Sequence, residues 1–221
     1  MIDILLISPE ITKGMKSVGS KCLLSLRKNL TLIEYQVSQL QKIKPAKITL
    51  NIGLDAEKIV TKLYRYKKIN YFINNKYSST NQAANLISYI KKYKPLGLLI
   101  FSSGLLIKNN IINQKDMQSG CKLFILNKNK NNFDIGCSNM KNPDYLFYDM
   151  PETWAEICYL DSAAIEMLFN SEEKIFEQMY LFEAINFLLQ KNIVFEKIYL
   201  NKNNIMKVQT LKDLPSAKAF I

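Results

Sequence analysis

Apolar residues in the first half of the chain alternate between short continuous runs and helical spacing. The run Ile2–Ile7 ends at Ser8 and Pro9 and predicts a buried strand. Further runs predict strands over residues 47–53, 69–73 and 96–101, and three-to-four spacing predicts helices over residues 31–43, 55–66 and 81–93. Strands and helices that alternate in this way indicate an α/β fold, with a mainly parallel central sheet and helices on both faces.

The second half has a different pattern, in which short apolar runs are joined by turns rich in asparagine and lysine. Trp154 is interpreted as part of a helical stretch, and the periodicity fits a helix from Asp161 to Phe169. Ser171, followed by Glu172 and Glu173, predicts a long helix over residues 171–190. Strands are expected over residues 122–126, 132–137, 145–148, 193–198 and 206–210, and a helix over residues 210–219. Because the pattern contains no linker or repeat, we expect one domain over residues 1–221.

The composition narrows the class of protein. With 48% hydrophobic residues among 221, the chain is globular rather than disordered. Its apolar runs are too short to span a bilayer and none follows a basic leader, so we expect a cytoplasmic protein without a membrane partner. The absence of histidine excludes Ser-His-Asp and Cys-His catalysis. The four cysteines form no CxxC pair and are expected to be reduced thiols.

Lysine carries the net charge of +11 and occurs in separate runs. The runs lie within residues 42–47, 62–68, 91–94 and 128–130, and tyrosines interleave with some of them, a pattern that also suits nucleic acid. The runs do not form one stripe along the sequence. We therefore interpret them as solvated faces and expect no nucleic-acid partner.

The segment between the first strand and Lys21 has the composition of a phosphate-binding loop. Residues 8–20 contain Gly14 and Gly19, several hydroxyl side chains, and Lys13 and Lys16. In α/β proteins, backbone amides and a lysine hold phosphates where such a loop joins a strand to a helix. Plain connections share this composition, so the loop alone does not decide its role.

Several short segments occur in an order that is found in one enzyme family. They are Lys21–Leu24, Leu32–Tyr35 followed by Ile48–Gly53, Asn74–Tyr77 followed by Thr80 and Asn81, Leu99–Gly104, and Thr210–Leu214 with Ala217. Each segment resembles one motif of that family. The motifs, given in the order of the segments, are Pro-Lys-x-Leu-Leu, I-E-Y … I-T-I-V-x-G-Y, N-x-x-Y-x-x-T-N, L-I-x-G-D and D-T-x-E-D-L-x-x-A. These motifs belong to the nucleotidyltransferases that activate sugar phosphates or phosphocholine, namely the sugar-nucleotide pyrophosphorylases and the choline-phosphate cytidylyltransferases.

The resemblance implies a nucleotide-diphospho-sugar transferase fold, which is a Rossmann-like α/β sandwich. It implies transfer of a nucleotidyl group from a nucleoside triphosphate to a small phosphorylated acceptor, with Mg²⁺ as cofactor. The nucleotide-binding half would cover residues 1–110 and the acceptor-side half residues 111–221. Lys21 would act in catalysis, on the phosphates. The implied nucleotide-binding residues are Ser8, Thr12, Lys13, Gly14, Asn75, Ser103 and Gly104, and the implied substrate-binding residues are Tyr77, Asn81 and Glu183.

The chain departs from the family motifs in the phosphate-binding loop and at the Mg²⁺-binding positions. The glycines and arginine of the family loop Leu-Ala-Ala-Gly-x-Gly-x-Arg fall at Glu10, Thr12 and Gly14. The two Mg²⁺-binding carboxylates fall at Gly104 and Gln209. An active enzyme would then take its metal ligands from the second half, where the candidates are Asp134, Asp144, Asp149 and Glu183. The alternative is a non-catalytic pseudoenzyme that serves as a binding or structural subunit of a larger protein assembly, such as a viral one.

Overall fold

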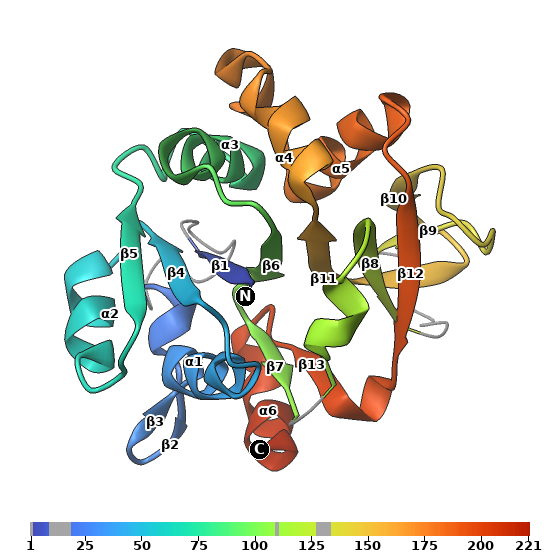
Figure 1. Ribbon diagram of the computed structural model, residues 1–221. Coiled ribbons are helices and arrows are strands. Elements are labelled where there is room, and N and C mark those ends of the chain that lie inside the picture. Colours follow the sequence, from blue (N-terminus) through green and yellow to red (C-terminus); the bar gives the residue numbers. More distant parts are fainter. Residues whose placement is uncertain (1, 9–18, 109–110, 127–133) are drawn as a thin grey trace.

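A mixed β-sheet forms the centre of the protein, for which a computed structural model describes residues 2–8, 19–108, 111–126 and 134–221 (Figure 1). Its parallel part consists of β1 (Asp3–Ser8), β4 (Lys47–Ile52), β5 (Ile69–Ile73) and β6 (Leu98–Ser102), in the order β6–β1–β4–β5. The burial of nearly every side chain in β1, β4 and β6 explains why the sequence shows them as continuous apolar runs. The predicted α/β fold class is therefore confirmed.

The second half of the chain extends this sheet around one long strand, β11 (Glu152–Leu160). Residues 157–160 of β11 pair antiparallel with β6, and β8 (Cys121–Leu126) pairs with the other edge of β11. At its start β11 pairs with β9 (Ile135–Cys137), which in turn pairs with β10 (Leu146–Tyr148). Strand β12 (Phe195–Leu200) lies parallel to β8. β11 thus joins the parallel strands to the strands of the second half.

Helices cover both faces of the sheet. Helices α3 (Gln82–Tyr93), α4 (Ser162–Phe169) and α5 (Leu181–Gln190) pack on one face, and α1 (Leu32–Lys42) and α2 (Ala56–Leu63) on the other (Figure 1). A smaller cluster joins the hairpin of β2 (Ser25–Arg27) and β3 (Leu30–Thr31) to β7 (Leu105–Ile107), β13 (Ile205–Lys207) and α6 (Leu214–Phe220). Through this cluster the end of the chain packs against the first half.

Local sequence signals account for the helices of the first half. Thr31 caps α1, its side chain accepting from the Glu34 amide while Glu34 accepts from the Thr31 amide, which is the predicted capping box. α1, α2 and α3 each lie within a predicted range. The segment before Lys21 does not lead directly into an α-helix, because Lys21–Leu23 form one 3-10 turn and the chain then enters β2. Among the residues that the structure describes, the first α-helix begins at Leu32.

Trp154 lies in β11 and not in a helical stretch, so that prediction is also wrong. Its indole Nε1 donates to the Ile157 carbonyl oxygen at 2.9 Å, and its side chain is buried. The helix expected after Asp161 is present as α4, and Asp161 caps it by accepting from the Ala164 amide. The residues around Trp154 are apolar because both faces of β11 are buried, and not because they form a helix.

The long helix predicted over residues 171–190 is interrupted. Residues 173–176 form a 3-10 turn, and α5 begins at Leu181 with Tyr180 at its N-cap. The carbonyl oxygens of Glu177 and Met179, which a continuous helix would use internally, accept from the amides of Asn81 and Ala83 at the start of α3. The interruption therefore docks this segment onto α3, a contact that the helical periodicity of the segment does not encode.

The four cysteines are free and buried, in agreement with their interpretation as thiols. Burial raises the pKa of the Cys121 thiol to about 12 and that of Cys137 to about 11, so both stay protonated at neutral pH. Among the described residues, no helix is long and apolar enough to cross a membrane.

One buried side chain holds β10 against α5 and provides a test of the fold. The Asn186 side chain accepts from the Leu146 amide and donates to the Leu146 carbonyl, each at 2.8 Å. Asn186→Ala leaves both buried backbone groups unpaired, and we expect it to lower the free energy of unfolding by about 2–4 kcal/mol. Urea denaturation measures this loss. Asn70→Ala, at an exposed position of β5, is the matched control and should change stability by less than about 0.5 kcal/mol; equal losses would contradict the assignment.

Candidate functional site

A cavity of about 250 Å³ opens at the carboxyl ends of β1 and β6. Ligands of open α/β sheets bind at this end of the strands, where the chain crosses between layers. The strand ends place Ser8, Ser102 and Ser103 on its floor, and α3 contributes Gln82 from its first turn. The remaining walls come from segments of both halves, and their residues are Ile7, Lys21, Ile135, Tyr148, Trp154, Glu156, Tyr180, Phe182 and Lys207.

Lys21 reaches this cavity because residue 104 has no side chain. A Cβ atom built on Gly104 would lie 3.1 Å from the Lys21 ammonium nitrogen and 2.7 Å from the Val208 carbonyl oxygen. The φ of Gly104 is +89°, and its carbonyl accepts from the Val208 amide at 2.8 Å. Glycine is therefore required at this position by conformation and by space, and the Lys21 side chain occupies the volume above it.

Asp55 holds the backbone at Ser20, the residue directly before Lys21. One of its carboxylate oxygens accepts from the Ser20 amide at 2.8 Å, and the other from the Lys58 ammonium at 2.8 Å. The hydrogen bond from Lys58 is the largest cause of the lowered pKa of Asp55, followed by the bond from Ser20. The φ of Gly19 is +83° and its α-carbon faces this carboxylate, so a side chain there would collide with Asp55.

A β-bulge projects Glu156 from β11. Residues 157–160 pair with β6, whereas Glu152 and Thr153 pair with β9, and the register against β8 shifts between Trp154 and Cys158. Within this irregularity Glu156 has a φ of 56°, a left-handed conformation that is unfavourable for a residue with a side chain. Bulges re-aim side chains near active sites, and strain of this kind marks functional positions.

Glu156 forms an ion pair with Lys207 of β13. Both residues line the first cavity and an adjoining one of about 400 Å³, which Asp134, Gln209 and Asp213 also line. The Asp213 carboxylate accepts from the amides of Gln209 and Thr210, so it is engaged in capping the 3-10 turn Leu211–Asp213 that precedes α6. Lys21 and Lys207 thus bring two ammonium groups to one cavity, and Glu156 orients the second.

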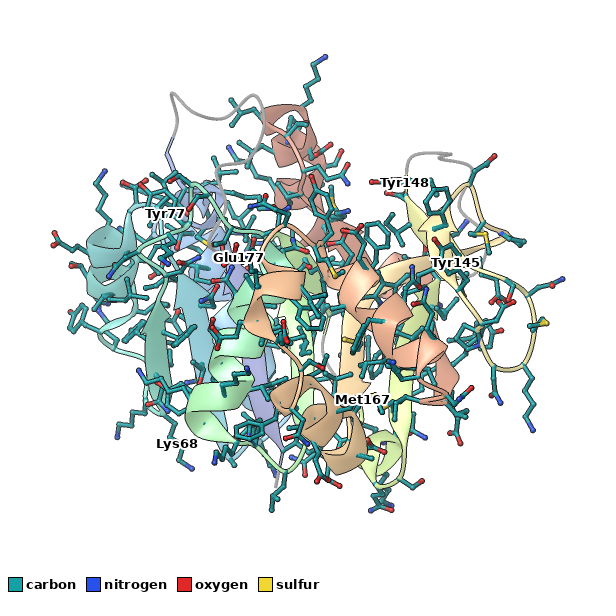
Figure 2. The ribbon with its side chains drawn as sticks, turned by 90° about the horizontal axis from the view of Figure 1, so that it is seen from above. Lys68, Tyr77, Tyr145, Tyr148, Met167 and Glu177 are labelled. Atoms are coloured by element: carbon teal, nitrogen blue, oxygen red, sulfur yellow. The ribbon has the colours of Figure 1, made fainter. Side chains whose placement is uncertain are left out.

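Aromatic rings form the wall of the cavity on the side of α5 and β10. Tyr148 and Phe182 meet edge to face with their centroids 6.0 Å apart, and Tyr180 stacks on Phe182 at 6.1 Å. Trp154 completes the set, with its polar nitrogen already bonded to the backbone. Figure 2 shows Tyr148 and Tyr145 on the opposite side of the molecule from Tyr77.

The structure brings some of the sequence-predicted residues together. Lys21, Ser8 and Ser103 line the cavity, and Gly104 lies directly beneath the Lys21 side chain. The hydroxyl of Ser8 is 2.8 Å from the Cys22 sulfur, which holds the end of β1 against the 3-10 turn that carries Lys21. Thr12, Lys13 and Gly14, together with Glu10, lie outside the described residues.

Four other predicted residues are placed elsewhere. Asn75 lines a separate, open hollow beside Asp55, and Tyr77 lies in the turn after β5, outside the residues that line the cavity. Asn81 stands at the N-cap position of α3 without a side-chain capping bond, and its side-chain amide donates to the Gln178 carbonyl. The Glu183 carboxylate accepts from the Tyr180 amide at 2.7 Å and caps α5. Their binding roles stay predictions, and for Asn81 and Glu183 the structure shows a structural use of the side chain.

Comparison with solved structures shows which fold this arrangement belongs to. The CTP:phosphocholine cytidylyltransferase of Streptococcus pneumoniae superposes with a TM-score of 0.83 at 13% identity, covering 99% of this chain and 98% of that one. A glucose-1-phosphate thymidylyltransferase of Bacillus anthracis gives 0.81 at 12%, and the inositol-1-phosphate CTP transferase of T. maritima gives 0.77 at 11%, each covering 99% of this chain and 94% of its own.

The chain has the nucleotidyltransferase fold. The match is structural, because neither the protein-family models nor the curated proteins match this sequence. The sequence identity of 11–13% indicates a divergent example of the fold. The departures from the family motifs at Gly104 and Gln209 agree with this divergence. The sequence resemblance to nucleotidyltransferases is thereby confirmed at the level of the fold.

The residues that this nucleotidyltransferase fold places around the cavity do not fit a metal site made of two carboxylates. Gly104 has no room for a carboxylate, and Gln209 offers an amide. Of the proposed substitutes, Asp134 lines the adjoining cavity, Asp144 accepts from the Ser138 hydroxyl, and Asp149 is exposed after β10. Within the described ranges, no three cysteine, aspartate or glutamate side chains gather as a metal site.

The sequence analysis missed the residues that the second half contributes to this site. Glu156 has a detectable signal, because it is the one charged residue in the otherwise apolar stretch from Trp154 to Leu160. A carboxylate inside a buried strand indicates a special position. Lys207 and the aromatic wall have no such signal, since their residues are separated in sequence and meet through strand pairing.

The strain at Glu156 leads to a prediction about stability. Glu156→Gly removes an unfavourable left-handed side chain, and we expect the free energy of unfolding to stay the same or rise by up to about 1 kcal/mol. Ala155→Gly on the same strand is the control and should lower it by about 0.5–1 kcal/mol. Urea denaturation compares the two. A larger loss for Glu156→Gly than for Ala155→Gly would show that the conformation at residue 156 is not strained.

The lowered pKa of Asp55 leads to a prediction about pH. A carboxyl whose pKa is lower when folded stabilises the protein above its unfolded-state pKa, and this stabilisation is lost as the pH falls through the folded-state pKa. Asp55→Asn is therefore expected to be less stable than the parent at pH 7, by about 1 kcal/mol, and the difference should shrink toward pH 3. Thermal unfolding across this range measures it. A difference that does not change with pH would contradict the assignment.

Proposed function

We propose that this protein transfers a nucleotidyl group from a nucleoside triphosphate to a small phosphorylated acceptor in the cavity at the ends of β1 and β6. The observation that carries the proposal is the position of Lys21. The motif resemblance assigns this lysine to the phosphates, and its side chain lies over Gly104 at the strand ends where ligands of this fold class bind. The three solved structures named above are nucleotidyltransferases that fit over nearly the whole chain.

The chemistry explains why two lysines are useful here. An oxygen of the acceptor phosphate attacks the α-phosphorus, a new P–O bond forms, and the bond to the bridging oxygen breaks so that pyrophosphate leaves with its electron pair. Because two anions must approach each other, catalysis depends mainly on position and on neutralising charge. Lys21 and Lys207 supply ammonium groups to the same cavity, and Glu156 holds Lys207 in orientation.

Mg²⁺ is expected from the resemblance, but the described side chains do not fit its site. No step of the proposed reaction is therefore assigned to a metal ion. Glu156 is the one carboxylate among the described residues of the first cavity, and its charge is engaged by Lys207. The dependence of nucleotide binding on Mg²⁺ stays a prediction, and the experiment below measures it.

The aromatic wall favours phosphocholine over a sugar phosphate as the acceptor. Tyr148, Trp154, Tyr180 and Phe182 offer ring faces and edges. Aromatic rings attract a quaternary ammonium through their quadrupole. A sugar instead needs an array of hydrogen-bonding side chains for its hydroxyl groups. The acceptor phosphate would face Lys207 and its head group would face the rings.

A second candidate function is a non-catalytic one. It is favoured by Gly104 and Gln209, which stand at the two positions where the family motif has carboxylates. In that case the cavity would bind a ligand without turnover, or the chain would act as a structural subunit of an assembly. The two functions differ in one measurable property, since the enzyme must bind a nucleoside triphosphate in the cavity.

Thermal shift with CTP, UTP, GTP, ATP and dTTP, with and without Mg²⁺, tests nucleotide binding. A nucleotide at 100 times its dissociation constant adds about 2.7 kcal/mol of stability, which raises the melting temperature by about 5–10 °C in a chain of this size. We expect one nucleotide to produce this shift, and Lys21→Ala to remove most of it. Lys212→Ala, at an exposed position before α6, is the matched control and should keep the shift.

The same preparation tests turnover and the acceptor. Release of pyrophosphate is expected with phosphocholine and the nucleotide that gives the shift, and Tyr148→Ala should raise the KM for phosphocholine with a smaller effect on the nucleotide shift. A shift for no nucleotide would end the transferase proposal. A shift without turnover on phosphocholine or sugar phosphates would favour the non-catalytic function.

A further inference from the structure

The lysine runs that are separate in the sequence come together in the structure. The connections that lead into β4, β5 and β6 all lie where the parallel strands begin, at the end of the sheet opposite the cavity. The lysines in these connections and at the element ends beside them form what we call the basic face, and they are Lys44, Lys47, Lys67, Lys68, Lys92 and Lys94. In Figure 2, Lys68 lies at the opposite end of the molecule from Tyr77 and Tyr148.

Hydrogen bonds and cation–π contacts link these connections to one another. The Gln41 side chain donates to the Lys67 carbonyl at 2.9 Å, and the Ile48 amide donates to the Lys68 carbonyl. The ammonium groups of Lys47 and Lys92 approach the ring of Tyr93 to within 5.4 and 5.2 Å of its centroid. Three of the four lysine runs therefore share one face of the molecule, although they are separate in the sequence.

Backbone conformation shows that lysine is disfavoured at three of these positions. Lys44, Lys68 and Lys94 have φ angles of 55°, 60° and 46°, the left-handed region where glycine and asparagine are favoured. Asparagine is abundant in this chain, yet lysine stands at all three positions. Each of the three side chains is exposed, and positive charge near a helix C-terminus accounts for a lysine there but not for its left-handed backbone.

Lysines outnumber carboxylates on the basic face. Asp3 forms an ion pair with Lys47 at 3.0 Å, and Glu173 forms one with Lys91, the neighbour of Lys92, at 4.0 Å. Asp116 lies beside Lys115 in the turn whose Gln114 side chain donates to the Lys44 carbonyl, and Asp161 follows β11 where that strand pairs with the start of β6. The acidic residues of α1 and α2 occupy their first turns, toward the other end of the sheet. A surface with several lysines and few carboxylates is complementary to a dense array of phosphates.

We propose, in departure from the expectation of no membrane partner, that the basic face binds an anionic lipid bilayer as a peripheral surface. Leu96 is the observation that separates a bilayer from nucleic acid. It is 86% exposed between Lys94 and the start of β6, and an aliphatic side chain flanked by lysines suits insertion among lipids. Base stacking needs open aromatic rings. The rings of Phe72, Tyr93 and Phe169 are already covered by lysine ammonium groups. Tyr64, which is 72% exposed in the connection into β5, has the Arg65 guanidinium over its ring at 5.3 Å.

Binding in this orientation leaves the cavity facing the aqueous phase, since it opens at the opposite end of the parallel strands. A protein held in this way would keep access to a soluble ligand while staying near the membrane surface. The inference does not depend on the proposed transferase activity, because none of its residues lines the cavity.

Vesicle cosedimentation tests the proposal, with phosphatidylcholine alone and with phosphatidylcholine containing phosphatidylglycerol. The protein should sediment with the anionic vesicles at low salt and be released at high salt. The triple variant Lys44→Asn, Lys68→Asn, Lys94→Asn keeps residues that tolerate the left-handed backbone, and it should lower the partition coefficient by roughly a hundred-fold. Leu96→Ser should lower it by roughly five-fold.

A triple variant of equal charge is the control. Lys76→Asn, Lys174→Asn, Lys212→Asn removes three exposed lysines that lie outside the basic face, and it should change partition by less than about three-fold. Equal loss in the two triple variants would overturn the proposal, and so would equal sedimentation with neutral and anionic vesicles. A mixed-sequence single-stranded oligonucleotide is tested in parallel. Tighter binding of the oligonucleotide than of the anionic vesicles, lost in the first triple variant, would assign the face to nucleic acid instead.

Discussion

Each edge of a strand can pair with one neighbour at a time, and β11 changes its neighbour halfway along one edge. Residues 157–160 pair with β6 and residues 152–153 with β9. Between them the ladder is interrupted, and the bulge that results turns Glu156 toward Lys207. The cavity, its aromatic wall and its second ammonium group all depend on this change of partner, because it separates the end of β6 from the strands that carry the rings.

The backbone at Gly104 explains why the Lys21 ammonium group lies at the end of β6. Gly104 is held by its positive φ and by the approach of Val208, which leaves a volume that the Lys21 side chain fills. From the sequence, the retained lysine and the missing carboxylate are two separate observations. In the structure they are one arrangement, in which a cation occupies the space that a side chain at residue 104 would need. The site is therefore built around positive groups, with Glu156 as the partner of Lys207.

The first half of the fold could be predicted because its signals are local. The capping box of Thr31 and Glu34 and the apolar runs of β1, β4 and β6 lie within single elements. Trp154 was misassigned because a strand buried on both faces resembles a buried helix in its apolar content. The start of α5 was missed because the carbonyl oxygens of Glu177 and Met179 accept from α3, a contact between segments far apart in sequence. Lys21 was assigned to the site through a motif, whereas Lys207 enters it through the pairing of β13 with β7.

The pairing of β6 with β11 also fixes an order of events during synthesis. All residues of β6 are buried in the finished protein, yet the strand that covers its second edge is made much later, after β7, β8 and β9. Until then the nascent first half exposes the open edge of its most apolar strand, a template for pairing with other chains. The amino-terminal half is thus poorly suited to an independent existence, and its solubility depends on the arrival of the second half.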